Sequence, residues 1–133
     1  MTAAQTSREA LSSRFEAWVN RALEQDIPMQ VRAFCFNLYE TGGAFGVELV
    51  GAPGYDPIDT DWACDEVFEY RRERFETPMD PFDGKWEKCL AFFAELLRRY
   101  LRTGAHAQKL KSSDAVAVGF VDGDLEVVWH NLD

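Results

Sequence analysis

Two stretches of the sequence repeat apolar side chains at the spacing of one helix face. The first runs from about Ser7 to Gln25, and it must end before Pro28 because the residue preceding a proline avoids helical angles. The second follows Asp83, which is placed to cap it, and stops at Gly104. The apolar positions are Leu11, Phe15, Trp18, Val19, Ala22 and Leu23 in the first, and Trp86, Cys89, Leu90, Phe93, Leu97, Tyr100 and Leu101 in the second. We therefore predict two amphipathic helices.

Alternating apolar residues on both sides of Gly42-Gly43 predict a hairpin of two strands. If the two glycines form a two-residue turn, Leu38 lies opposite Val47 and Phe36 lies opposite Leu49. Both strands then direct their bulky side chains to the same side of the sheet, which supports this register.

A second hairpin is predicted near the end of the sequence, over residues 115–129, with its turn at Asp122-Gly123. Between the hairpins, residues 62–70 alternate less clearly and predict an edge strand. It is flanked by two proline-containing loops, 52–61 and 71–84. The pairs expected in the second hairpin are Phe120 with Leu125, Val118 with Val127, and Val116 with Trp129.

These elements predict an α+β fold in the order α-β-β-β-α-β-β. We expect a two-layer sandwich, in which an antiparallel sheet of about five strands carries the two amphipathic helices on one face. The bulky face of the strands is then buried under the helices, and the opposite face is thin and partly polar.

Composition and length favour a single domain over residues 1–133, because 47% of the residues are hydrophobic and one core is enough for a chain of this size. Residues 1–13 lack the apolar stretch of a signal peptide, and no run approaches the roughly 18 apolar residues of a membrane span. The cysteines, Cys35, Cys64 and Cys89, are odd in number and so do not form a complete disulfide framework, which suits a reducing compartment. We therefore expect a cytoplasmic protein that does not act at a membrane.

Charge is distributed unevenly in a chain whose formal net charge is −9. The stretch from Ala33 to Tyr70 contains no lysine or arginine but eight acidic residues. They are Glu40, Glu48, Asp56, Asp59, Asp61, Asp65, Glu66 and Glu69. An acidic surface repels nucleic acids and attracts basic partners, so we expect no nucleic-acid ligand.

Few residues offer catalytic chemistry. Any Cys–His pair would have to combine Cys64 with His106 or His130, and nothing around Cys64 resembles a nucleophile elbow or an activated thiol. The sequence also lacks a glycine-rich phosphate loop, a Cys-x-x-Cys pair and a His-Glu-x-x-His motif. We predict that the protein is not an enzyme and needs no cofactor.

The closely spaced aspartates of the acidic stretch are candidate ligands for a hard cation. Calcium loops, however, place acids at alternate positions around a glycine, and Pro57 and Trp62 interrupt that order here. We therefore predict no metal site. The stretch is then either a solvated face or a protein-binding surface, and Tyr55 and Trp62 among the acids are typical of a binding hot spot. Trp62 is equally a candidate for the core.

Four segments, 34–40, 47–52, 62–68 and 118–125, resemble small bacterial immunity proteins that neutralise the toxin domains of contact-dependent, Rhs-type or type VI secretion systems. The similarity runs from about Phe34 to Trp129 and consists of hydrophobic strands around an acidic patch centred on a tryptophan. The resemblance implies a stoichiometric inhibitor, made in the bacterial cytoplasm, that binds its cognate toxin and blocks it or holds it inactive.

Charge and resemblance together predict an immunity protein whose partner is a toxin domain with a basic surface. Two other functions stay open: a small hydrolase or transferase that uses Cys64, and a non-catalytic adaptor subunit. The residues expected at the centre of the partner-binding surface are Tyr55, Asp56, Asp59, Asp61, Trp62, Asp65 and Glu66.

Overall fold

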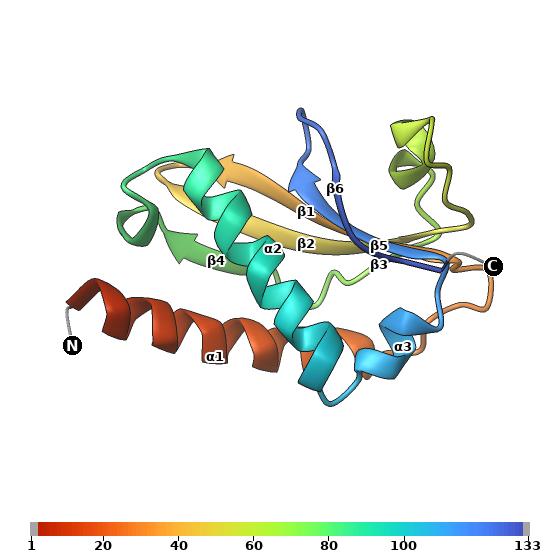
Figure 1. The fold of residues 1–133 in the computed structure, drawn as a ribbon, viewed down its shortest axis with the longest axis horizontal. Coiled ribbons are helices and arrows are strands. Elements are labelled where there is room, and N and C mark those ends of the chain that lie inside the picture. Colours follow the sequence, from red (N-terminus) through yellow and green to blue (C-terminus); the bar gives the residue numbers. More distant parts are fainter. Residues whose placement is uncertain (1–2, 132–133) are drawn as a thin grey trace.

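The structure is a computed structural model that describes residues 3–131, with side chains from Arg8 onward apart from that of Thr60. Within these residues the chain forms a six-stranded sheet, three α-helices and two short 3₁₀ helices (Figure 1). The elements are α1 (Ala3–Leu23), β1 (Ala33–Thr41), β2 (Ala44–Ala52), η1 (Thr60–Cys64), β3 (Phe68–Glu69), β4 (Phe75–Pro78), η2 (Asp80–Phe82), α2 (Trp86–Thr103), α3 (Ala107–Lys111), β5 (Ala115–Phe120) and β6 (Glu126–His130). The predicted α+β class is confirmed.

Both predicted long helices are present, with α1 displaced a few residues towards the N-terminus. Gly104 ends α2, and its N–H donates to the carbonyl oxygen of Tyr100 at 2.6 Å. Asp83 does not cap α2, because Lys85 takes that position and the Asp83 carboxylate instead pairs with Lys88 at 2.6 Å. In the described part of the chain, no helix combines the length and apolar character needed to cross a membrane.

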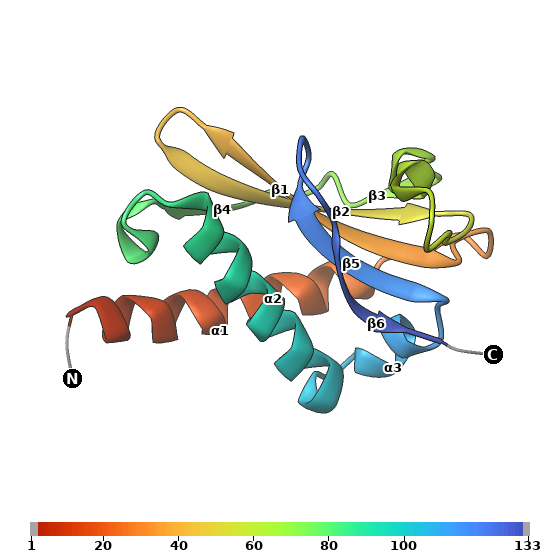
Figure 2. The same cartoon turned by 45° about the horizontal axis from the view of Figure 1, so that its top comes forward.

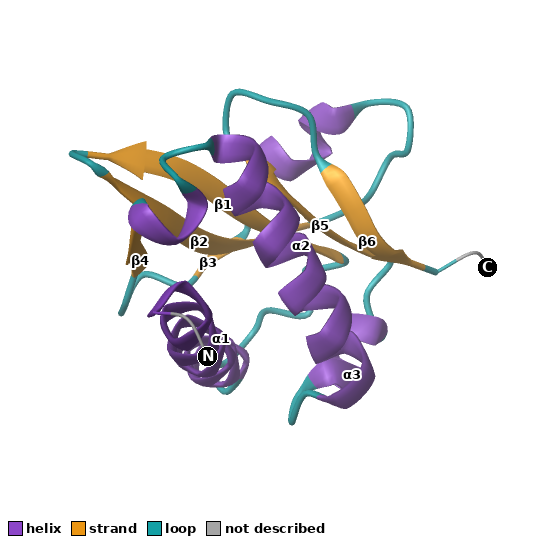
Figure 3. Cartoon of the chain, turned by 60° about the vertical axis from the view of Figure 1, so that its left-hand side comes forward, coloured by secondary structure: helices purple, strands orange, loops and turns teal. Residues whose placement is uncertain are grey.

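The two long helices cover the same face of the sheet and enclose the main hydrophobic core (Figure 3). The ring of Phe15 on α1 lies 6.3 Å from that of Phe36 on β1 and 4.9 Å from that of Phe93 on α2, so it joins all three elements. Trp18 packs beside Phe15 and donates its indole N–H to the carbonyl oxygen of Glu73 at 2.8 Å. This layer matches the bulky, buried face that the strand pattern predicts.

The β1–β2 hairpin has the predicted register, with Leu38 opposite Val47 and Phe36 opposite Leu49. Gly42 and Gly43 form the turn with φ angles of 49° and 91°. Two-residue hairpin turns that match the strand twist require such positive angles, which glycine adopts without strain.

The prediction of an entirely antiparallel sheet is wrong, because β1 and β5 are parallel neighbours. The strand order is β3-β2-β1-β5-β6, and β4 also pairs with β2. Between β2 and β5 the chain crosses the helical face through α2 and α3, so that Ala115 arrives beside Ala33 at the start of β1. A helical crossover of this kind is what allows two neighbouring strands to run in the same direction.

The predicted edge strand at 62–70 is largely wrong, since residues 60–64 form η1 and only Phe68 and Glu69 pair with β2. A strand absent from the prediction, β4, lies in the predicted loop 71–84, where Phe75 and Thr77 are buried in alternation. The alternation covers four residues and ends at Pro78, which is too short a pattern to predict a strand. The real element order therefore contains β4 and α3 in addition to the predicted elements.

The second hairpin keeps only part of its predicted register. Val116 lies opposite Trp129 as expected, but a bulge follows and Val118 pairs with Glu126 rather than Val127. The predicted pairing of Phe120 with Leu125 is also wrong, because β6 begins only at Glu126. The loop instead folds back over Gly119, where an added Cβ would lie 2.6 Å from the carbonyl oxygen of Asp124.

Candidate functional site

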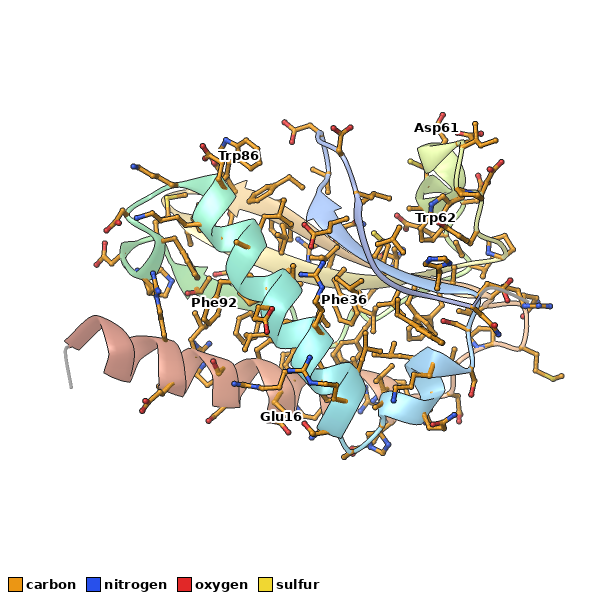
Figure 4. The ribbon with its side chains drawn as sticks, viewed as in Figure 1. Glu16, Phe36, Asp61, Trp62, Trp86 and Phe92 are labelled. Carbon is orange, nitrogen blue, oxygen red and sulfur yellow. The ribbon has the colours of Figure 1, made fainter. Side chains whose placement is uncertain are left out.

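The part of the acidic stretch that follows β2, residues 53–66, lies on the face of the sheet that the helices leave free, and we call it the acidic segment. Trp62 and Ala63 of η1 are 93% and 92% buried there, on a floor of small side chains that includes Ala33, Cys35 and Ala117. Figure 2 shows η1 and the β5–β6 loop on the same side of the sheet, away from α1, and in Figure 4 Trp62 points from η1 towards the strands. The thin face is therefore partly covered by residues from the acidic stretch itself.

Two aspartates fix the local shape of this segment through their own side chains. Asp59 caps η1, because its Oδ1 accepts a hydrogen bond from the backbone N–H of Asp61 at 3.0 Å. The Oδ1 of Asp56 accepts from the backbone N–H of Ile58 at 2.9 Å. Such short side-chain to backbone bonds are typical of aspartate in turns and at helix starts. The segment after η1 rejoins the sheet where Val67 donates its N–H to the carbonyl oxygen of Gly51 at 2.9 Å.

A groove of about 270 Å³ separates η1 from the β5–β6 loop. Three carboxylates, those of Glu48, Asp61 and Glu66, line it and define what we call the acidic groove. Its other lining residues are Asn37, Ala63, Cys64, Phe120, Val121, Gly123 and Leu125. None of these described lining residues is basic.

The carboxylates of the acidic groove have no salt-bridge partner in the part of the chain that the structure describes. Among the ion pairs of the described residues none involves Glu48, Asp61 or Glu66. Burial raises the pKa of Glu66 above its ordinary value, and the nearby charges of Glu69 and Glu48 raise it further, whereas Arg71 opposes the shift. Like charges that share a partly desolvated site favour the entry of a proton or a cation.

Polar contacts continue from the groove into the sheet. Asn37 donates from Nδ2 to Oε1 of Glu48 at 3.4 Å, and its own Oδ1 accepts from the buried thiol of Cys35 at 3.0 Å. These bonds orient Glu48 on the thin face of β2. Glu48 and Asn37 are absent from the predicted site, although both occupy the thin, polar positions of the alternating strand pattern.

The structure brings together only part of the predicted binding surface. Asp61 and Glu66 share the acidic groove, whereas Asp56, Asp59 and Asp65 are exposed on the segment outside it. Tyr55 is half-buried and its ring meets that of Trp62 edge-on, with centroids 5.5 Å apart. Trp62 is a core residue on the thin face of the sheet, which is the alternative that its sequence context left open.

Neither histidine is hydrogen-bonded to Cys64 in the described chain. His106 contacts Glu24 of the helical layer through Nε2 at 3.0 Å, and the His130 ring lies 6.4 Å from that of Tyr55. Cys64 is exposed at the acidic groove and has no hydrogen bond to either histidine. Within residues 3–131, no group of three or more His, Cys, Asp and Glu side chains is arranged to hold a metal ion.

In comparisons with known proteins, no family model, no curated protein and no solved structure matches the chain.

Proposed function

We propose that the protein is a bacterial immunity protein that acts in the cytoplasm, where it binds a cognate toxin domain and blocks it without catalysing a reaction. The observation that carries the proposal is the acidic groove, whose carboxylates Glu48, Asp61 and Glu66 form no ion pair within the described chain. The resemblance of the strands and the acidic segment to immunity proteins agrees with this function.

Electrostatics supports a basic protein surface as the partner. A lysine or arginine placed in the acidic groove would offset the repulsion between Glu48 and Glu66 and the cost of partly burying Glu66. The exposed aspartates 56, 59 and 65 extend the negative field beyond the groove, and such a field accelerates encounter with an oppositely charged partner. Toxins that act on nucleic acids or nucleotides have basic clefts, which an acidic segment of this kind can occupy.

Tyr55 and Trp62 have a different role from the aspartates in this proposal. Because Trp62 is buried against the sheet and the Tyr55 ring packs on it in a T-shaped contact, the two rings hold the acidic segment in place. The segment is then presented to the partner as a fixed surface, which lowers the conformational entropy lost on binding.

A growth assay tests the proposed function. The tagged chain is recovered from its native cell, and the C-terminal domain of any large exported protein that accompanies it is expressed in a neutral host. We expect that domain to arrest growth and co-expression of the present chain to restore it. A partner that leaves growth unaffected would instead indicate the adaptor function.

Charge reversal links the rescue to the acidic segment. The variant Asp61→Lys, Asp65→Lys, Glu66→Lys alters three exposed side chains and spares Asp59, which is needed as the η1 cap. The matched control, Glu9→Lys, Glu16→Lys, Glu95→Lys, makes the same change in net charge on exposed positions of α1 and α2. The first variant should lose rescue and the control should keep it. Equal rescue by both would exclude the acidic segment from the partner surface.

A further inference from the structure

Trp86 is an exposed aromatic residue at a position where the helix pattern predicts burial. It is the first residue of α2, 51% of its surface is exposed, and its ring meets that of Phe120 edge-on with centroids 5.9 Å apart. Figure 4 places Trp86 at the upper end of α2, well away from Phe36 in the middle of the core. Large exposed aromatic side chains are characteristic of protein-binding hot spots.

A second groove, of about 530 Å³, lies beside Trp86, and we call it the tryptophan groove. Phe120 and Val121 contribute apolar surface, and Val121 is 60% exposed. Glu40 and Asp122 supply two exposed carboxylates. Phe120 and Val121 also line the acidic groove, so the two grooves meet at the β5–β6 loop.

The tryptophan groove contains an open strand edge. β1 pairs with β2 up to Thr41, but its pairing with β5 stops at Leu38, whose carbonyl oxygen accepts the N–H of Val121 at 3.0 Å. In a two-residue hairpin the pair next to the turn, here Thr41 and Ala44, is hydrogen-bonded across the strands. Glu40, the residue before Thr41, therefore directs its main-chain N–H and C=O away from β2, to the side that β5 no longer covers.

We propose that the tryptophan groove binds an extended, arginine-bearing segment of the protein partner. A guanidinium stacks best on tryptophan among the aromatic side chains and pairs with carboxylates through parallel hydrogen bonds, and Trp86 offers the ring while Glu40 and Asp122 offer the carboxylates. The open edge at Glu40 adds main-chain hydrogen bonds to an extended segment.

The chain's own basic residues agree with this assignment. The guanidinium of Arg74 lies 6.0 Å from the centre of the Tyr39 ring, and Tyr39 also lines the tryptophan groove, so this region already accepts a guanidinium over an aromatic ring. Lys88, two residues after Trp86 on α2, is paired with Asp83. The inference rests on the proposed protein-binding function and adds to it the chemistry of the partner segment.

A peptide titration followed by backbone NMR tests the inference. The probe is a capped six-residue peptide of alternating valine and arginine, and the control peptide carries glutamate in place of each arginine. We expect shift changes centred on residues 39–41, 86 and 120–123, with a dissociation constant of roughly 1 mM, the range of short weak ligands. The glutamate peptide should cause no such changes.

Two variants make the result specific. Trp86→Ala and the double variant Glu40→Lys, Asp122→Lys should each lower the affinity for the arginine peptide at least several-fold. Glu9→Lys should leave that affinity unchanged. The double variant changes exposed side chains alone, so it remains informative if Trp86→Ala loses stability. Absence of shifts with the arginine peptide, equal binding of the glutamate peptide, or unchanged binding by the double variant would overturn the inference. If the chain still rescues growth when the peptide experiment gives one of these results, the inference fails but the proposed function stands.

Discussion

The rings of Tyr55 and Trp62 meet in a T-shaped contact, with centroids 5.5 Å apart and planes at 87°. Trp62 in turn lies on the small side chains of the sheet, so this pair joins an acidic surface segment to the second, smaller core. The segment is consequently held in one position although it contains several like charges. The arrangement explains how a charged stretch with two prolines, Pro53 and Pro57, keeps a defined shape.

Trp62→Ala should release the acidic segment from the sheet. Removing a buried tryptophan typically lowers the free energy of unfolding by about 3–5 kcal/mol, and Trp86→Ala should cost clearly less because Trp86 is half exposed. Urea unfolding compares the two variants, and limited proteolysis should show faster cleavage within residues 53–61 of Trp62→Ala alone. Equal losses in the two variants would contradict the clamping role of Trp62.

The three cysteines should differ sharply in reactivity. Burial raises the pKa of both Cys35 and Cys89 to about 12, so almost no thiolate forms at either site near neutral pH, whereas Cys64 is exposed. A thiol-reactive reagent at neutral pH should modify Cys64 alone in the folded protein and all three cysteines in denaturant. Peptide mapping by mass spectrometry identifies the sites, and early modification of Cys35 would contradict the packing of the second core.

Glu66 should titrate above the ordinary glutamate value of 4.5, because burial and the charges of Glu69 and Glu48 disfavour its carboxylate. A raised pKa in the folded state means that the folded chain holds this proton more tightly than the unfolded chain. The group therefore lowers stability at neutral pH, and this penalty shrinks as the pH falls through the folded pKa and is gone below the ordinary value. NMR titration of the side-chain carboxyl measures the midpoint. Glu48→Gln should move the midpoint down, and a Glu66 midpoint at or below 4.5 would contradict the crowding of the acidic groove.

The position of the β5–β6 loop over β5 should depend on the absence of a side chain at Gly119. An added Cβ would lie 2.6 Å from the main-chain oxygen of Asp124, a contact that only a shift of the loop relieves. Gly119→Ala should therefore lower the free energy of unfolding by about 1–3 kcal/mol, the usual cost of overpacking. Gly54→Ala is the matched control, since no atom lies within 4 Å of the added Cβ. Equal unfolding midpoints in urea for the two variants would contradict the loop position.

The sequence predicts those parts of the fold in which one local pattern decides the outcome. The register of the β1–β2 hairpin follows from Gly42-Gly43 and from alternation on both sides of it. The long helices follow from their apolar spacing, except that Trp86 lies past the edge of the core and stays exposed. Parallel pairing of β1 with β5 depends on the path of the α2–α3 crossover, which no local pattern records.

The candidate site is predictable to a similar degree. Asp61 and Glu66 follow from the lysine-free and arginine-free stretch, but their meeting with Glu48 depends on η1 folding over the thin face of the sheet. Alternation in β2 places Glu48 on that face without indicating what lies across from it. The burial of Trp62 likewise depends on tertiary packing, because a short 3₁₀ helix has no apolar periodicity of its own.

The affinity of the purified toxin domain for the Asp61→Lys, Asp65→Lys, Glu66→Lys variant, measured by calorimetry beside the parent chain and the Glu9→Lys, Glu16→Lys, Glu95→Lys control, is the most direct test of the role proposed for the acidic segment. We predict that the three reversed charges weaken binding by roughly 100-fold or more, because opposed like charges at an interface cost several kcal/mol, and that the control binds as the parent does. Parent-like affinity of the first variant, with an unchanged melting temperature, would contradict that role.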